Sequence, residues 1–275
     1  MVSVLAIGFA GEVCRDYYLK LMERMSELPS SQHIMPSFFH LVVELERRKL
    51  GETIIATYFE ISSKLSYYFV LQYLDYALVF RTFGSDSTEI AQEYNKFCTG
   101  THPMYEAGAP MDALCVKCID TEEAIGKITR GGIDDAEETY SLQLGSFVQK
   151  PCVINGSENI YRHILSLLFE ENKRAMIIQD DYPYWHACGE TDHSGKLLLI
   201  DEATENSSLV QIFFDDNVER DRAHIVDVRK LPGLEKVSFE DANDKLYVRV
   251  SPFEIISDPH YYINTFDEVL LRRNI

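Results

Sequence analysis

The sequence has few basic residues and no long apolar run, and both absences exclude classes of protein. Its 275 residues include 26 lysines and arginines against 44 aspartates and glutamates, which gives a formal net charge of −18. This balance disfavours binding to nucleic-acid phosphates and to anionic lipids. No stretch approaches the roughly 18 consecutive apolar residues of a membrane helix, and the N-terminus lacks the basic region and cleavage site of a secretory signal. We expect a cytoplasmic protein that binds neither nucleic acid nor membrane.

The motifs of several large enzyme classes are also missing. We find no GxSxG nucleophile elbow, no GxGxxG after a predicted strand and no GxxxxGK[ST] phosphate loop. The chain has six cysteines, and they lack the dense, regular spacing of a disulfide framework. We therefore expect reduced thiols that pack as small apolar side chains.

Apolar runs and amphipathic segments alternate along most of the chain. Runs with the character of buried strands occur at 2–7, 76–80, 140–144, 175–178, 196–200, 209–214 and 224–228. Helical spacing of apolar residues occurs at 36–50, at 86–98 and from Ser157 onward. The second of these helices begins with Asp86 and Glu89, three residues apart, as in a capping box. The alternation predicts an α/β fold, specifically a Rossmann-like, mostly parallel sheet covered by helices.

The regular pattern weakens between residues 100 and 156. This part of the chain is rich in turn-forming and polar residues, as in GTHPMYEAGAP and RGGIDDAEE. We interpret 100–156 as an insertion or cap-like region. Residues 1–99, with a helical insertion at about 14–70, and residues 157–275 would then form the two parts of the α/β core.

Polar residues suited to a phosphoryl group stand near the ends of the predicted strands. Arg81 and Thr82 follow one strand, Lys196 begins another, and Asp215 and Asp216 follow a third. Open α/β sheets bind ligands at the carboxyl ends of their strands. Guanidinium, hydroxyl and ammonium groups bind phosphoryl oxygens, whereas paired carboxylates suit Mg²⁺. The pattern predicts phosphate binding by the first three residues and a weak Mg²⁺ site at the two aspartates.

The order of these residues resembles that of the haloacid dehalogenase (HAD) superfamily of phosphohydrolases. Its four motifs are Asp-x-Asp-x-Thr, a Ser or Thr, a Lys, and paired acids, each placed at a strand of one sheet. Thr82 matches the second motif and Lys196 the third, and Asp215 with Asp216 matches the fourth. The resemblance implies a HAD-like fold over most of the chain.

The first HAD motif is where this sequence departs from the superfamily. Laid on AIGFAGE, the motif places Gly8 at the nucleophilic aspartate and Ala10 at the general acid. The superfamily forms an aspartyl-phosphate at the first position and protonates the leaving oxygen from the second, and neither glycine nor alanine has a group for these steps. The resemblance therefore implies a pseudoenzyme with weakly bound Mg²⁺ at most. It would keep a phosphate-sized polar pocket for a phosphorylated small molecule or a protein partner. The oligomeric state stays open.

Two other functions remain as alternatives. The first is an active Mg²⁺-dependent phosphatase with an unrecognised nucleophile, for which Glu12 and Asp16 are the nearby candidates. The second is a zinc-stabilised interaction module. Its possible ligands are Cys98, His102, Cys115 and Cys118. We favour buried thiols and a capping histidine over a zinc site.

A second group of metal-binding residue types occurs in the stretch WHACGETDH, which contains His186, Cys188 and His193. The stretch follows Tyr182 and includes Trp185, and aromatic residues at this spacing indicate packing. We interpret the tryptophan as part of the core and the two histidines as residues of a surface loop.

Overall fold

The protein is an α/β protein in which the described strands form one five-stranded sheet and two smaller sheets. The computed structural model describes residues 19–20, 22–23, 26, 34–49, 76–108, 110–116, 126–132, 138–145, 152–170, 174–201, 209–220 and 224–273. The predicted strand at 2–7 lies outside these residues, together with Gly8, Ala10, Glu12, Asp16 and Cys118.

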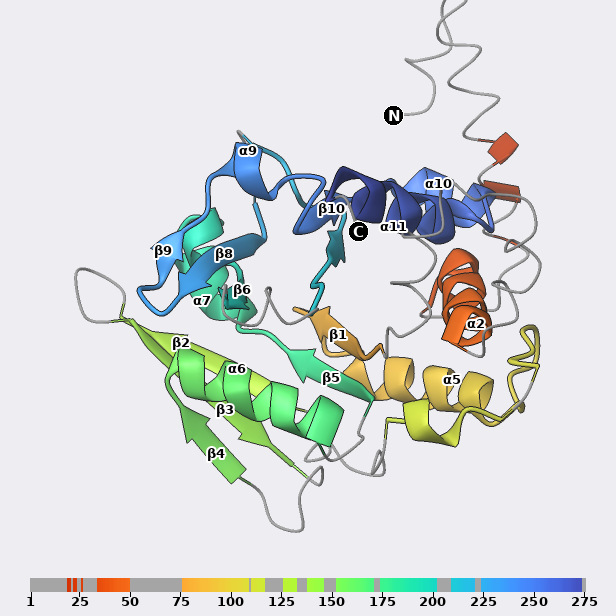
Figure 1. Ribbon diagram of the computed structural model, residues 1–275, viewed down its shortest axis with the longest axis horizontal. Helices are drawn as coiled ribbons and strands as arrows, with labels where there is room; N and C mark the ends of the chain where they lie inside the picture. Colours follow the sequence, from red (N-terminus) through yellow and green to blue (C-terminus); the bar gives the residue numbers. More distant parts are fainter. Residues whose placement is uncertain are drawn as a thin grey trace, which may run out of the picture.

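The five-stranded sheet has a parallel half and an antiparallel half (Figure 1). Its strands are β1 (Leu78–Thr82), β2 (Gly126–Gly131), β3 (Thr139–Leu144), β4 (Cys152–Asn155) and β5 (Ala175–Gln179). The spatial order is β1-β5-β2-β3-β4, with β5 parallel to both of its neighbours and β3 antiparallel to both of its own. Strand β5, which lies between β1 and β2, is almost continuously apolar because it is buried on both faces.

Two smaller sheets hold the remaining described strands. The first contains β6 (Lys196–Asp201), β8 (Val226–Leu231) and β9 (Glu235–Lys236), with β6 parallel to β8 and β8 antiparallel to β9. The second is a parallel pair of β7 (Phe213–Asp215) and β10 (Tyr247–Arg249). The strands that carry the predicted site residues, β1, β6 and β7, thus belong to three different sheets. The described strands therefore do not form the single sheet that the resemblance implies, and the HAD-like fold stays a prediction.

The helices surround these sheets (Figure 1). They are α2 (Pro36–Lys49), α5 (Ser87–Cys98), α6 (Ser157–Leu165), α7 (Tyr182–Ala187), α9 (Phe239–Ala242), α10 (Pro252–Ser257) and α11 (Tyr261–Arg272), with short 3₁₀ turns at Asp112–Leu114 and Asp192–Ser194 and a π-helical turn at Ser166–Glu170. Helix α6 packs on β3 and β4, and α2 packs on α10 and α11. None of the described helices combines the length and the hydropathy that crossing a bilayer requires.

Two apolar clusters form most of the core. The larger one joins the five-stranded sheet to α2 and α5, with Phe39, Tyr94 and Ile177 among its fully buried side chains. The smaller one lies around β8 and β10 and includes Trp185 and Tyr247. The helices and strands around each cluster bury their apolar faces in it.

The structure confirms most of the predicted elements. The helices predicted at 36–50 and 86–98 are α2 and α5, and the strands predicted at 175–178 and 196–200 are β5 and β6. The strand predicted at 209–214 is wrong in extent, since β7 covers only Phe213–Asp215. The segment 100–156 was predicted as an insertion, but its strands β2, β3 and β4 are hydrogen-bonded into the same sheet as β1 and β5.

Candidate functional site

A buried ion pair between Lys196 and Asp215 lies where β1, β6 and β7 approach one another. The Lys196 ammonium nitrogen is 2.9 Å from Asp215 Oδ2, and the two side chains are 6% and 9% exposed. The same nitrogen donates to the main-chain oxygen of Arg81 at 3.3 Å. It also lies 5.2 Å from the ring centroid of Phe83 and 5.9 Å from that of Phe213. A carboxylate, a carbonyl and two aromatic faces therefore stabilise this buried cation.

A second buried ion pair, between Arg81 and Asp180, lies beside the first. The Arg81 guanidinium binds the Asp180 carboxylate through two of its nitrogens, with Nε 2.7 Å from Oδ2. A third nitrogen donates to the main-chain oxygen of Leu197 at 3.2 Å. Arg81 was predicted to bind phosphate, but these contacts direct its guanidinium to protein acceptors, and it fastens the end of β1 to β6. We call Arg81, Thr82, Asp180, Lys196, Asp215 and Asp216 the Lys196 cluster.

Thr82 lies at the end of β1, in the loop that leads into α5. Its hydroxyl oxygen accepts a hydrogen bond from the Gly84 N–H at 2.9 Å, and its O–H donates to Asp86 Oδ1 at 3.3 Å. Asp86 precedes the helix, but the predicted capping box is wrong, because the Asp86 side chain makes no capping hydrogen bond. The N–H groups in the first turn of α5 thus lack a capping side chain, and this end of the 12-residue helix bears a partial positive charge.

Asp216 differs from Asp215 in its environment. Asp215 Oδ1 accepts a hydrogen bond from the Asn217 N–H at 2.9 Å, while Asp216 Oδ1 lies 3.3 Å from the Asn217 side-chain nitrogen. Partial burial, together with the charge of Asp215 and a hydrogen bond to it, raises the pKa of Asp216 above its ordinary value. Asp215 holds the nearby ammonium, and Asp216 takes up a proton more readily than an ordinary aspartate.

The described residues do not fit a Mg²⁺ site. Both oxygens of Asp215 are engaged, one by Lys196 and the other by Asn217. Within the described part of the chain, no group of three or more His, Cys, Asp or Glu side chains is arranged to hold a metal ion. Mg²⁺ requires near-octahedral coordination by oxygen. Asp215 and Asp216 therefore do not by themselves provide the coordination of a Mg²⁺ ion.

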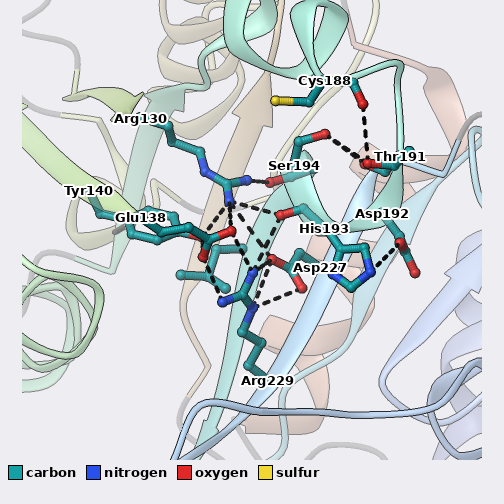
Figure 2. A network of polar contacts seen from close by, with 12 residues as sticks. Arg130, Glu138, Tyr140, Cys188, Thr191, Asp192, His193, Ser194, Asp227 and Arg229 are labelled. Carbon is teal, nitrogen blue, oxygen red and sulfur yellow. Dashed lines mark hydrogen bonds and ion pairs between the residues drawn. The ribbon is translucent and has the colours of Figure 1, made fainter. Parts of the chain in front are cut away.

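The structure also contains a polar network that the sequence analysis missed (Figure 2). At its centre is Arg130 of β2, whose guanidinium donates to the main-chain oxygens of Gly195 at 2.7 Å and His193 at 2.9 Å, and to the Tyr140 hydroxyl at 2.5 Å. The guanidinium carbon lies 4.5 Å and 4.7 Å from the ring centroids of Tyr140 and Tyr184. Arg130 thus connects the five-stranded sheet to the turn that precedes β6.

Arg229 of β8 completes this network. Its guanidinium contacts both oxygens of the fully buried Asp227 at 3.1 and 3.0 Å, and it pairs with Glu138 at 2.7 Å. Figure 2 shows Glu138 near the guanidinium groups of both Arg130 and Arg229. Burial raises the pKa of Asp227, against the opposing effect of Arg229. The sequence signal for this network was Asp227 within the stretch HIVDVR. A carboxylate in a buried strand requires a buried partner, so its position indicates a buried ion pair.

Among the residues of the alternative zinc site, Cys98 and Cys115 share a side-chain hydrogen bond, His102 has other partners, and Cys118 lies outside the described residues. His102 Nδ1 accepts hydrogen bonds from the N–H groups of Met104 at 3.2 Å and Tyr105 at 3.1 Å, and Nε2 lies 3.4 Å from Glu93 Oε1. With Nδ1 as an acceptor, Nε2 carries the proton, so both ring nitrogens are used. Burial raises the pKa of Cys98 to about 12, which disfavours the thiolate that zinc requires.

The residues of the stretch WHACGETDH are divided between the core and the surface. Trp185 is buried in the smaller core cluster, as predicted, and its Nε1 donates to the main-chain oxygen of Thr191 at 3.1 Å. His186 is exposed and lies 3.0 Å from Glu190, and the His193 ring is exposed and lies 3.2 Å from Lys236 Nζ. The two histidine rings therefore have separate partners.

Comparison of the chain with protein-family models, with curated proteins and with solved structures finds no match. The candidate site is therefore identified from the contacts and charges of its own residues, and it is the Lys196 cluster.

Proposed function

We propose that the protein is a HAD-like α/β protein that binds a phosphoryl group at the Lys196 cluster without hydrolysing it. The observation that supports this most directly is the position of the Lys196 ammonium, which contacts Asp215 of β7 and the main chain of Arg81 in β1. Lys196 and Asp215, the matches to two HAD motifs, are thus in contact, and the same cation bonds to the main chain next to Thr82, the match to a third.

Donors for a phosphoryl oxygen are available at this point. The Lys196 ammonium has three N–H groups, and the hydrogen bonds to described residues use two of them. The Thr82 hydroxyl would exchange its hydrogen bond to Asp86 for one to the ligand. Thr82 and the first turn of α5, which lacks a capping side chain, flank Phe83, whose ring contacts the ammonium. Helix N-termini favour phosphate through their N–H groups and their partial charge.

Two buried carboxylates of the cluster, and the residue at the expected nucleophile position, support binding without turnover. A HAD-type reaction requires a carboxylate that is free to attack phosphorus. Asp180 is held by Arg81 and Asp215 by Lys196, so both are ion-paired and buried. At the expected nucleophile position the sequence has Gly8. These features support a ligand-binding role in place of phosphoryl transfer.

The first test is calorimetric titration of the protein with inorganic phosphate. We expect saturable binding by the wild-type protein, loss of binding in Lys196→Met and weaker binding in Thr82→Val. The matched control is Lys245→Met, which removes an exposed lysine and should leave binding unchanged. Thr82→Val keeps the test informative if Lys196→Met does not fold, which circular dichroism will show. Absence of phosphate binding by the folded wild-type protein would overturn the proposal.

The second test addresses catalysis. We expect p-nitrophenyl phosphate to remain intact when it is incubated with the protein and Mg²⁺. Turnover that requires Mg²⁺ and disappears in Asp215→Asn would refute the non-hydrolytic function and establish the active phosphatase in its place.

A further inference from the structure

We infer that Arg130 is a positioning residue that fixes Lys196 and Asp180 from outside the Lys196 cluster; the ligand-binding part of this role rests on the proposed function. The first contact is with the turn before β6. Arg130 donates to the main-chain oxygens of His193 and Gly195, and Gly195 immediately precedes Lys196. The guanidinium therefore holds the backbone from which the Lys196 side chain extends (Figure 2).

Gly195 is also confined on its other side. A Cβ atom at Gly195 would lie 2.3 Å from the main-chain oxygen of Ile225, and the Lys196 N–H donates to this same oxygen at 2.5 Å. The entry to β6 is thus held between Arg130 and the chain leading into β8. A shift in the Arg130 contacts would move the backbone at Lys196.

The second contact is made by the main chain of Arg130. Its N–H donates to Asp181 Oδ2 at 2.9 Å, and Asp181 Oδ1 caps α7 by accepting the N–H of Tyr184 at 3.1 Å. Asp181 follows Asp180, the partner of Arg81. One residue of β2 is therefore bonded to the immediate neighbours of both Lys196 and Asp180.

The chemistry of this position requires arginine. The Arg130 side chain is 4% exposed, and its planar guanidinium lies against two tyrosine rings while it binds two carbonyls and a hydroxyl. Arginine has five N–H groups in a fixed fork, whereas lysine has one compact ammonium. We expect Arg130→Lys to preserve the charge and only part of the positioning.

Arg174 provides a matched control. It is also buried, it donates to the main-chain oxygen of Tyr76 at 3.0 and 2.7 Å, and its guanidinium carbon lies 4.8 Å from the Tyr76 ring centroid. It stands at the opposite end of β1 from Thr82, because the Leu78 N–H bonds to the Arg174 oxygen. Arg174→Met removes a comparable buried guanidinium far along the sheet from the cluster.

The experiment measures how fast an amine-reactive acylating reagent labels Lys196 in the folded protein, by peptide mass spectrometry, relative to the exposed Lys245 in the same sample. We expect about tenfold faster labelling in Arg130→Met, the factor that corresponds to about 1.4 kcal/mol of lost positioning. Arg130→Lys should be intermediate, and Arg174→Met should match the wild type. Arg130→Gln replaces Arg130→Met if that variant does not fold.

Two results would overturn the inference. The first is that Lys196 in the folded Arg130 variants is labelled at the same rate as in the wild-type protein. The second is that Arg174→Met increases this rate as much as Arg130→Met does. The labelling experiment needs no ligand, so the positioning role and the proposed function can be refuted independently. If the wild-type protein binds no phosphate while Arg130→Met still exposes Lys196, only the proposed function is refuted. If phosphate binds but labelling is unchanged, only the positioning role is refuted.

Discussion

At the scale of single residues, the buried charges of this protein are stabilised by specific partners. Lys196 is paired with Asp215 and Arg81 with Asp180, and all four side chains are largely removed from solvent. Removal of one member of such a pair leaves a buried charge without compensation, which costs more than the intact pair contributes. The stability of the protein is therefore sensitive to single substitutions in the candidate site.

Lys196→Met should lower the free energy of unfolding by about 3 kcal/mol, because it leaves the Asp215 carboxylate buried and unpaired. The double variant Lys196→Met/Asp215→Asn should regain part of this loss, since the unpaired charge is gone. Urea denaturation of the single and double variants, arranged as a double-mutant cycle, measures the coupling. Strictly additive losses would contradict the ion pair.

Glu138 supplies a pH-dependent contribution to stability. Burial alone would raise its pKa, but the hydrogen bond and charge of Arg229, with the charge of Arg130, outweigh burial and lower it below 4.5. A carboxyl group with a lowered pKa in the folded state stabilises the protein above the unfolded-state pKa and loses this effect as the pH falls through the folded-state pKa. Glu138→Gln should therefore cost below about 1 kcal/mol near pH 7, since a third of the side chain is exposed.

That cost should shrink as the pH falls below 4.5, the ordinary glutamate value. Denaturation curves of the wild-type protein and Glu138→Gln between neutral pH and pH 4 measure the difference. A constant difference across this range would show that Glu138 is not held by the arginines.

The residues of the Lys196 cluster were partly accessible from the sequence. Lys196 and Asp215 could be identified as candidates because they are polar residues next to apolar runs, and the structure places the two in contact. The partners of Arg81 and the role of Arg130 could not be predicted this way, because each contact joins segments that only the tertiary fold brings together. The position of Asp227 within an apolar strand indicates a buried charge, but it does not identify the partner of that charge.

At the scale of elements, the helices and strands with strong periodicity were predictable and their pairing was not. The apolar face of α2 and the continuous apolar run of β5 fix these elements locally. The sheet order β1-β5-β2-β3-β4 depends on contacts between distant segments. This explains why the sequence of 100–156, with short strands and many polar residues, predicts an insertion.

The entry to β6 tolerates no side chain at Gly195. Gly195→Ala would place Cβ 2.3 Å from the main-chain oxygen of Ile225, so the backbone must move and the free energy of unfolding should fall by about 2 kcal/mol. Gly233→Ala is the control, because its Cβ would lie 3.6 Å from the nearest atom of the flexible Glu235 side chain. We expect Gly233→Ala to change stability by less than about 0.5 kcal/mol in urea denaturation. Equal effects of the two substitutions would contradict the close contact.

At the scale of the whole molecule, charge repulsion opposes folding. The formal net charge of −18 comes from 44 acidic and 26 basic residues. Compact chains with such an imbalance are destabilised by repulsion between like charges. The buried ion pairs lie within the molecule, where dissolved salt screens them less than charges at the surface.

An increase in sodium chloride from about 20 mM to about 300 mM should therefore raise the melting temperature by a few degrees, because it shortens the Debye length and weakens the repulsion. Circular dichroism melting curves at constant pH measure the shift. A lower melting temperature at the higher salt concentration would mean that attractive surface pairs outweigh the repulsion.

The pairing of β1 with β5 also bears on how the chain acquires its structure during synthesis. Leu78 is opposite Ala175 and Thr82 is opposite Gln179, so β1 leaves the ribosome well before its only neighbour in the described sheet. Contacts between such distant segments form slowly. Among the described strands, β1 thus has no partner until translation has passed residue 179, which makes this interval the one in which a chaperone would protect it from aggregation.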